Sequence, residues 1–450
     1  MADPVDARLP DLTEELLDFL RIPSISTDPA HADAVAAAGR WLVDRMRRAG
    51  LTASLETTAG HPIALGRHDA GPGAPTVLVY GHYDVQPPEP LEPWSSPPFE
   101  PEVRDGRIWG RGAADDKAQV LVQVAAAEVA LTTSGLPVSL VLLFEGEEEV
   151  GSPSLGPWLS DHADALAADH VLIADSMMFA PGRPSLIFGM RGIAYFEIEA
   201  SIGSTDLHSG QYGGAVPNPA NALAAVIASM HREGRVAVDG FYDDVVMPPA
   251  SLLEEWRTLG FDEEAFQASA GGARPAGEPG FATPERLWVR PSLDVNGLVS
   301  GYTGPGKKTV LPARALAKLS ARLVPEQDPV RIEAVLRDHV ARMAPAGVAF
   351  EVRSLQHNRP WRDDPDAPLF RAAAAALESG FGAAPVRVAH GGTLPIAPEL
   401  RDVLGAPVAV MGFALPGANM HAPNEWFPVA HLERGIRTMT RLYHELAEGP

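Results

Sequence analysis

Histidine and carboxylate side chains recur in short clusters along this chain, and the clusters follow or adjoin predicted strands. They are His82 with Asp84 in GHYDVQP, Asp115 with Asp116 in GRGAADDK, Glu147 to Glu149 in EGEEEVGS, Asp175 in IADS, and His421 in NMHAPNE. Imidazole nitrogens and carboxylate oxygens are ligands of zinc, manganese and similar divalent ions. Two such ions, about 3.5 to 4 Å apart, need a bridging carboxylate and hold a hydroxide between them. The residue types therefore predict a site for two divalent metal ions.

The composition excludes other kinds of site and partner. The chain has no cysteine, so a thiolate metal site and a disulfide framework are both excluded. Its formal net charge of -22 argues against nucleic acid and anionic membrane surfaces as partners. The first residues, MADPVDARLP, contain no apolar signal region, and charges interrupt the later apolar stretches before membrane-spanning length. We therefore expect a cytoplasmic protein with no membrane contact.

The clusters coincide with an alternation of strands and helices. Apolar runs that end in charged residues predict buried strands at 76–84, 138–149 and 170–175, and the residues after Asp116 predict a helix that ends at Gly135. This order is typical of an α/β fold with a mostly parallel sheet, whose ligands gather outside the carboxyl ends of the strands. The acidic residues are predicted to lie at that edge.

A second pattern begins after Met190. Predicted strands at 193–203, 314–325 and 347–355 alternate with predicted helices at 218–234 and 328–343. A chain of 450 residues is expected to form more than one domain. We predict a catalytic metal-binding domain, a mostly parallel mixed sheet flanked by helices, from 1–190 and 364–450, with an inserted α+β lid and dimerisation domain at 191–363. The Gly-, Ala- and Pro-rich stretch 264–284 is expected to be a surface loop.

Seven motifs follow one another in the order of a known family. VLVYGHYDVQP, WGRGAADDKA, FEGEEEVGS, DLHSGQYGG, DVNGLVSGYTGPGKKTVLP, ARLVP and GGTLP resemble the co-catalytic metallopeptidases that include carnosinase-type dipeptidases, aminoacylase, carboxypeptidase G and succinyl-diaminopimelate desuccinylase. The carnosinase-type dipeptidases are the most similar, because DLHSG is followed by YGG and by the long segment from DVNG to KTVLP. The resemblance implies a metal-dependent hydrolase that cleaves the amide bond of dipeptides or very short peptides through a metal-bridging hydroxide.

The resemblance also implies roles for individual residues. It makes His82 and Asp175 ligands of one ion, Glu149 and His421 ligands of the other, and Asp115 the bridge. Two ions are expected per subunit, with zinc favoured and manganese as the alternative. The family places its general base directly before a ligand in Glu-Glu-x-Gly-Ser, which selects Glu148 and leaves Glu147 as an additional acid outside the motif. Asp84 resembles the carboxylate that orients the ligating imidazole, and the Asp115–Asp116 peptide is expected to be cis.

The remaining assignments concern the inserted domain and the substrate. His208 of DLHSG resembles the donor that stabilises the oxyanion from a neighbouring subunit, which implies a homodimer through the inserted domain. Five residues resemble those that bind the terminal carboxylate and backbone of the substrate in this family. They are Arg322, Asn296, Gly391, Gly392 and Thr393. His208 could instead be a turn residue, and Arg322 and Asn296 ordinary polar residues at strand ends. His357 and His390 belong to no motif.

Two other functions stay open from the residues alone. An N-acyl amino acid deacylase, of the aminoacylase or desuccinylase type, would use the same metals and base on a different amide. A catalytically inactive dimeric scaffold would keep the fold, although the presence of the whole ligand set and the base speaks against it. The sequence does not determine the preferred substrate or the native metal.

Overall fold

The computed structural model describes residues 4–449, which form two compact units. The first unit extends to Phe188 and resumes at Asp363–Val388 and from Ile396 onward. The second unit contains Gly189–Arg362 and Ala389–Pro395. We expected Ala389–Pro395 in the catalytic domain, but this segment joins the second unit, where its backbone and side chains form hydrogen bonds. The outer bounds of the predicted domain, residues 1 and 450, lie outside the described residues.

The first unit is built on a mixed sheet with parallel central strands, and the predicted α/β fold is confirmed. The strand order is β1-β2-β6-β3-β7-β19-β8, with β6, β3, β7 and β19 parallel. The strands are β1 (Thr52–Glu56), β2 (Ile63–His68), β3 (Thr76–His82), β6 (Ser139–Glu145), β7 (His170–Ile173), β8 (Ser185–Met190) and β19 (Val408–Val410). Every residue of β3 and β6 after the first is buried, which explains their continuous apolar sequences. Smaller strands are β4 (Glu102–Arg104), β5 (Arg107–Trp109), β18 (Val386–His390) and β20 (Trp426–Pro428).

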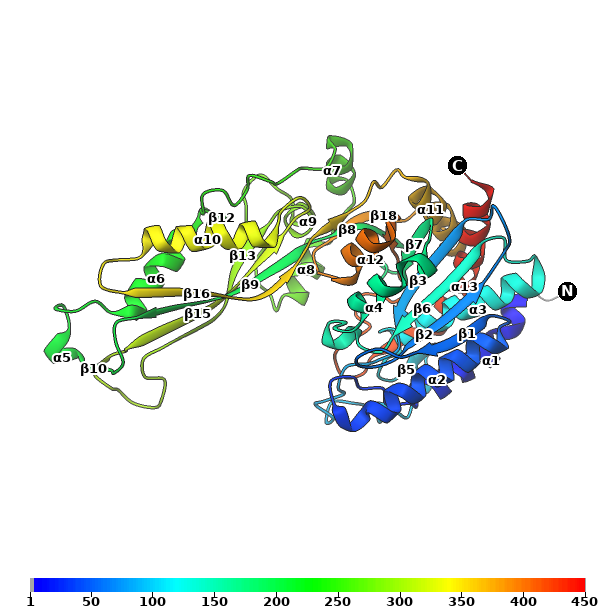
Figure 1. The fold of residues 1–450 in the computed structure, drawn as a ribbon, viewed down its shortest axis with the longest axis horizontal. Coiled ribbons are helices and arrows are strands. Elements are labelled where there is room, and N and C mark those ends of the chain that lie inside the picture. Colours follow the sequence, from blue (N-terminus) through cyan, green and yellow to red (C-terminus); the bar gives the residue numbers. More distant parts are fainter. Residues whose placement is uncertain (1–3, 450) are drawn as a thin grey trace. The chain divides into compact units, whose positions relative to one another are not determined.

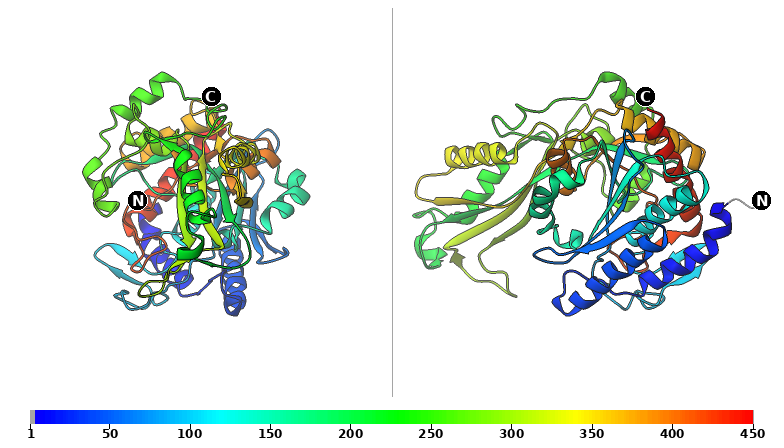
Figure 2. Two further views of the ribbon diagram at one scale, coloured as in Figure 1. Left: turned by 90° about the vertical axis from the view of Figure 1, so that its left-hand side faces the viewer. Right: turned by 45° about the vertical axis from the view of Figure 1, so that its right-hand side comes forward.

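Helices cover this sheet. They are α1 (Pro4–Leu20), α2 (Ala32–Arg48), α3 (Lys117–Thr133), α4 (Leu155–His162), α11 (Pro368–Phe381), α12 (Ile396–Leu404) and α13 (Val429–Glu448). α2 packs on β1 and β2, α3 packs on β3 and β6, and α13 packs on α3 and α11. Figure 2 shows α1 and α2 side by side, where Arg45 of α2 donates a hydrogen bond to Glu15 of α1. Between residues 4 and 449, no helix has both the length and the apolar character needed to cross a bilayer.

The second unit is an antiparallel sheet with helices on one face. Its strands β9 (Gly192–Ser201), β13 (Ser292–Ser300), β15 (Arg314–Leu323) and β16 (Ala349–Asn358) follow the order β13-β15-β9-β16. α6 (Pro219–Ser229) and α10 (Pro329–Met343) both pack on β9, and Figure 1 shows them along the same face of the sheet. Alternate residues of β9 are buried, as a sheet with one covered face requires. Asn218 and Asp328 cap these two helices, and each is followed by proline at the first helical position.

The other elements of this unit are short. They are β10 (Leu207–His208), β11 (His231–Arg232), β12 (Arg235–Val236), β14 (Val310–Leu311), β17 (Trp361–Arg362), α5 (Ser209–Tyr212), α7 (Ala250–Arg257), α8 (Glu263–Ser269) and α9 (Thr283–Trp288). The prediction of a surface loop over 264–284 is wrong in part, because helices occupy both ends of this stretch. Between them, Glu278 is buried in an ion pair with Arg290 at 2.6 Å. Periodicity could not reveal this, since an ion pair rather than an apolar face anchors the segment.

Candidate metal centre

Three parallel strands end side by side at one edge of the first unit's sheet. His82 is the last residue of β3 and pairs with Glu145, the last residue of β6. Asp175 follows β7, the neighbour of β3 on its other side. The carboxyl ends of parallel strands share an edge, and ligands of α/β proteins bind outside it. The fold therefore brings His82 and Asp175 to one place.

A short helix, a turn and a loop bring the other side chains to this edge. Glu149 lies in the short helix Glu148–Val150, directly after β6. Asp115 lies in the turn before α3, and its peptide bond to Asp116 is cis, as predicted. His421 lies in the loop before β20 and meets Asp115 across 306 residues of sequence.

His82, Asp115 and Asp175 form one group of metal-ligand type. His82 Nε2 lies 3.0 Å from Asp115 Oδ1 and 3.8 Å from Asp175 Oδ2. The other ring nitrogen, Nδ1, lies 3.1 Å from the carbonyl oxygen of Asp84 and 3.3 Å from its carboxylate. Asp84 therefore orients the imidazole so that Nε2 faces the carboxylates.

Asp115, Glu149 and His421 form a second group. His421 Nε2 lies 2.8 Å from Asp115 Oδ2 and 3.4 Å from Glu149 Oε2. In each group the ligand atoms lie within 4.8 Å of one another. Asp115 directs one carboxylate oxygen to each group, which is the arrangement that a carboxylate bridging two ions requires.

Glu148 and Glu149 are adjacent in sequence but differ in position. Among the described residues, Glu149 belongs to a ligand group and Glu148 to neither. The carboxylate of Asp84 accepts the backbone N–H of Glu148 at 3.2 Å and that of Glu149 at 3.1 Å, which fixes the turn. Gln86 Nε2 donates a hydrogen bond to Glu149 Oε2 at 2.7 Å. The sequence analysis assigned no role to Gln86.

Burial and mutual repulsion raise the pKa values of several acidic groups at this edge. Burial and the nearby carboxylate of Asp175 raise the pKa of Glu148 to about 8. Burial and Asp115 raise the pKa of Glu149 to about 8 and that of Asp175 to about 6. Burial opposes ionisation of Asp115 as well, but hydrogen bonds from two histidines hold its pKa below the ordinary value. The hydrogen bond to Asp115 raises the pKa of His421 to about 9.

These residues fit a pair of divalent cations. Glu149 Oε1 is buried and has no hydrogen-bond partner among the described residues. In the same part of the chain, neither lysine nor arginine forms an ion pair with Asp115, Glu149 or Asp175. Buried carboxylates of like charge are unfavourable unless a cation neutralises them. Nitrogen and oxygen donors without thiolate suit zinc or manganese.

Glu425 was missed by the sequence analysis and anchors the loop of Asp115. It is fully buried. Its Oε2 accepts hydrogen bonds from Arg111 Nη1 and the Gly112 N–H, both at 2.8 Å. Its Oε1 accepts the N–H of Ala114 at 2.7 Å and that of Asp115 at 3.0 Å. A signal was present, because Glu425 is the last residue of the NMHAPNE motif.

Glu147 has a structural position beside the cluster. Its Oε1 accepts the N–H of His61 at 2.8 Å, and its Oε2 accepts the N–H of Ser154 at 3.2 Å. Like the cluster it is buried, but it is not in either ligand group of the described residues. Glu147 therefore ties two backbone segments together.

His208 and Asn296 belong to the second unit and are described within it. His208 ends β10 and is exposed, and its Nδ1 accepts the N–H of Gly210 at 3.0 Å. Asn296 lies at a bulge of β13, where the pairing with β15 shifts register, and is also exposed.

Arg322 and the predicted glycine–threonine loop come together in the second unit. Arg322 Nη1 donates to Thr393 Oγ1 at 2.9 Å. Thr393 Oγ1 donates in turn to the carbonyl oxygen of Arg191 at 2.7 Å. His390 Nδ1 accepts the N–H of Gly392 at 3.0 Å. The sequence motifs marked neither Arg191 nor His390, although both shape this loop.

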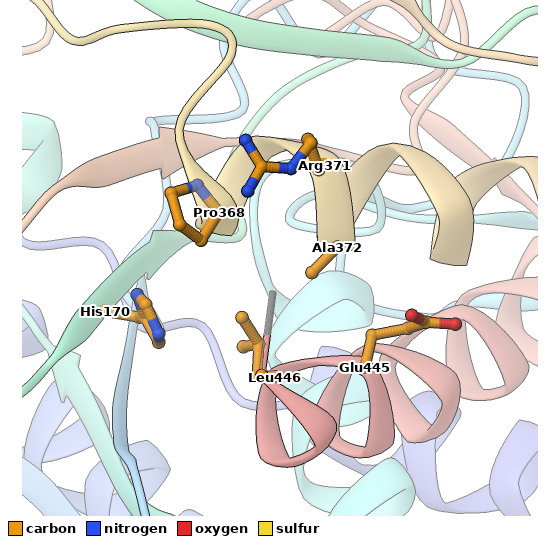
Figure 3. A pocket seen from close by; sticks show the side chains of 7 residues that line it. His170, Pro368, Arg371, Ala372, Glu445 and Leu446 are labelled. Carbon is orange, nitrogen blue, oxygen red and sulfur yellow. The ribbon is translucent and has the colours of Figure 1, made fainter.

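A cavity of about 220 Å³ lies at the other end of β7. Figure 3 shows His170, the first residue of β7, near Pro368 of α11 and Leu446 of α13. Asp175 follows the carboxyl end of the same strand. The cavity and the histidine–carboxylate cluster therefore lie at opposite edges of the sheet.

Comparisons with known proteins agree with this geometry. The model of peptidase family M20/M25/M40 matches residues 78–445. The chain is 28% identical to the Cys-Gly metallodipeptidase dug1 of Schizosaccharomyces pombe, over 98% of this chain and 97% of that protein. It is 30% identical to the Beta-Ala-His dipeptidase of Rattus norvegicus, over 86% and 80%. The M20 family metallo-carboxypeptidase Sso-CP2 from Sulfolobus solfataricus has a TM-score of 0.83 at 31% identity, over 96% and 98%.

The family model covers most of the chain, and the chain therefore belongs to peptidase family M20/M25/M40. The resemblance seen in the motifs is confirmed, as is the class of enzyme, a metallopeptidase.

Proposed function

We propose that this chain hydrolyses the amide bond of dipeptides or very short peptides with two divalent metal ions, zinc or alternatively manganese. The observation that carries the proposal is the pair of ligand groups that share Asp115. Two relatives with dipeptidase names, similar over most of the chain, support dipeptides as the substrate class.

Each ion has its own ligands in this proposal. His82 and Asp175 would hold one ion, Glu149 and His421 would hold the other, and Asp115 would contribute to both sites. When bound, such ions lower the pKa of water from about 15.7 to about 7 and polarise the substrate carbonyl. Partners that orient a ligating imidazole commonly contribute to metal affinity, and the two contacts of Asp84 with His82 Nδ1 support that role.

Glu148 is the general base of the proposed reaction. As a carboxylate it accepts a proton from the attacking water and then donates that proton to the leaving nitrogen. The pKa of Glu148 is about 8 when no cation is bound. A general base must be ionised, and bound cations would favour the carboxylate form of Glu148.

A homodimer through the second unit is part of the proposal. His208 donates a hydrogen bond to the oxyanion of the tetrahedral intermediate in a partner chain's site. The hydrogen bond that Nδ1 accepts from Gly210 supports this role, because it places the proton of a neutral imidazole on Nε2. The side chains of Arg322 and Asn296 and the loop Gly391 to Thr393 hold the substrate's carboxylate and backbone.

Mixing two inactive variants tests the action of His208 in trans. A heterodimer of His208→Ala and Glu148→Ala chains contains one site with both groups intact. Random mixing of equal amounts should restore roughly a quarter of the wild-type activity. If subunits exchange and no activity returns, His208 does not act in trans.

Product analysis tests the substrate class. The enzyme, supplied with zinc or manganese, is incubated with dipeptides, tripeptides and N-acetyl and N-succinyl amino acids, and both products are identified. Two free amino acids from dipeptides, formed faster than any other product, support the proposal. Faster release of carboxylic acids supports a deacylase, and faster cleavage of tripeptides supports a carboxypeptidase, a specific alternative because Sso-CP2 is named as one.

Two outcomes lie outside these activities. An absence of turnover with every substrate and metal would support an inactive scaffold. A cytoplasmic location stays a prediction, which cell fractionation tests.

A further inference from the structure

In the part of the chain that the structure describes, the buried arginines are paired with carboxylates, with one exception. Within residues 4–449, the buried arginines are Arg45, Arg111, Arg191 and Arg290. The ion pairs of three of them are Arg45 with Glu15 and Glu128, Arg111 with Glu425, and Arg290 with Glu278. Such pairing is expected because a buried charge is costly unless an opposite charge neutralises it. Arg191, with 9% of its surface exposed, is the exception.

Among residues 4–449, Arg191 donates only to neutral acceptors. Its Nε donates to the carbonyl oxygen of Gly391 at 3.0 Å, and its Nη1 donates to that of Arg290 at 3.4 Å. Its own carbonyl oxygen accepts the hydroxyl of Thr393. No aspartate or glutamate of the described residues forms an ion pair with it, and Asp294 attracts its charge without a direct contact.

A second arginine without an ion pair among the described residues lies beside it. Arg322 is half-buried and donates to the Thr393 hydroxyl, the same group that bonds the Arg191 backbone. Burial, and then repulsion from Arg322, lower the pKa of Arg191 to about 10, and Asp294 compensates this only in part. The fold therefore holds two like charges together, an arrangement that a bound anion would stabilise.

The loop that joins the two arginines is shaped for close approach. A Cβ on Gly391 would lie 2.9 Å from the carbonyl oxygen of Leu287 and 3.1 Å from Arg191 Nη2, so a larger residue would displace the guanidinium. Burial and Arg191 keep the pKa of His390 below its ordinary value, and the neutral imidazole accepts the N–H of Gly392. The loop therefore places neutral hydrogen-bonding groups beside the two arginines and no carboxylate that would neutralise them.

We propose that Arg191 is a positioning residue of a carboxylate-binding site: its guanidinium holds the Gly391 loop in place and, with Arg322, supplies the positive charge that selects substrates with a free C-terminal carboxylate. A planar carboxylate matches the fork of guanidinium N–H donors. The nature of the substrate rests on the proposed dipeptidase function, whereas the site for a carboxylate rests on the two arginines and the loop.

Steady-state kinetics on a matched pair of substrates test the role of Arg191. KM and kcat are measured for Ala-Leu and for Ala-Leu amide, which lacks the carboxylate. Arg191→Met should raise KM for Ala-Leu about tenfold, because the loop loses the hydrogen bond that holds it and the site loses one of its two positive charges, and should leave kcat within about twofold. The kcat/KM for the amide should hardly change. Arg191→Lys, which keeps the charge, should lie between wild type and Arg191→Met.

Arg290→Lys is the matched control, because Arg290 is a neighbouring buried arginine whose charge Glu278 compensates. It should lower the melting temperature without changing the preference for Ala-Leu over its amide. Equal loss of kcat/KM for both substrates in the Arg191 variants would mean that Arg191 is merely structural, and would overturn the proposal.

Binding without turnover separates this proposal from the dipeptidase function. Calorimetry with leucine and leucinamide should show that wild type binds leucine more tightly and that Arg191→Met loses the difference. If wild type cleaves no dipeptide but shows this difference, the dipeptidase proposal fails and the carboxylate site stands. If wild type binds leucine no more tightly than leucinamide, the carboxylate site is refuted.

Discussion

Replacement of Glu425 by glutamine tests whether a buried carboxylate outside the ligand set controls metal binding. Glu425 accepts four hydrogen bonds, two on each oxygen, and one of the donors is the backbone N–H of Asp115. Glutamine has nearly the same shape, but it keeps one acceptor oxygen and presents an NH2 group in place of the other. Two of the four donors then face a donor, and Arg111 loses its charged partner.

The expected cost follows from these contacts. A buried donor left without an acceptor costs about 1–3 kcal/mol, and removal of one partner of a buried ion pair costs about 3–5 kcal/mol. These costs overlap because Arg111 is one of the donors, so we expect a total of about 3–5 kcal/mol and a fall in melting temperature of roughly 5–10 °C. Displacement of the Asp115 loop should weaken metal binding about 10- to 100-fold, the usual effect of losing a partner that orients a ligand.

Metal titration of the metal-free protein, followed by calorimetry, measures both quantities. Glu278→Gln is the control, because Glu278 forms the corresponding buried ion pair with Arg290 in the second unit. It should lower the melting temperature without changing metal affinity. Wild-type metal affinity in Glu425→Gln, at a reduced melting temperature, would show that Glu425 stabilises the fold without positioning Asp115.

The remaining predictions concern the ions and the base. Two ions should bind per chain, and their removal by a chelator should lower the melting temperature, because the carboxylates around Asp115 then repel one another; saturation at one ion would contradict the shared bridge. Glu148→Gln should retain both ions and lose about 10² to 10⁴ in kcat, whereas Glu149→Gln should lose affinity for one ion. Glu147→Gln should change kcat and metal content little, since the Glu147 side chain bonds only backbone N–H groups among residues 4–449. If Glu147→Gln proves to be the inactive variant that retains both ions, the base and ligand assignments are both wrong.

Local sequence was sufficient to predict much of the cluster. Apolar runs that end in charged residues predict parallel strands, and parallel strands bring their carboxyl ends to one edge, so the proximity of His82 and Asp175 follows from the pattern alone. The resemblance to the family's Glu-Glu-x-Gly-Ser motif separated Glu149, which lies in a ligand group, from Glu148, which lies in neither. These features are readable because secondary structure and motif spacing depend on residues that are close in sequence.

Only the tertiary structure decided which distant residues share a charge or a hydrogen bond. Glu425 reaches the loop of Asp115 across 310 residues, and Arg191 reaches Gly391 across 200. Such contacts have no periodicity and no fixed spacing, so the sequence does not reveal whether a buried arginine has a carboxylate partner. Arg111 has a carboxylate partner, whereas buried Arg191 has no ion pair among the described residues. Tertiary packing decides this difference, because the segments around each arginine are distant from it in sequence.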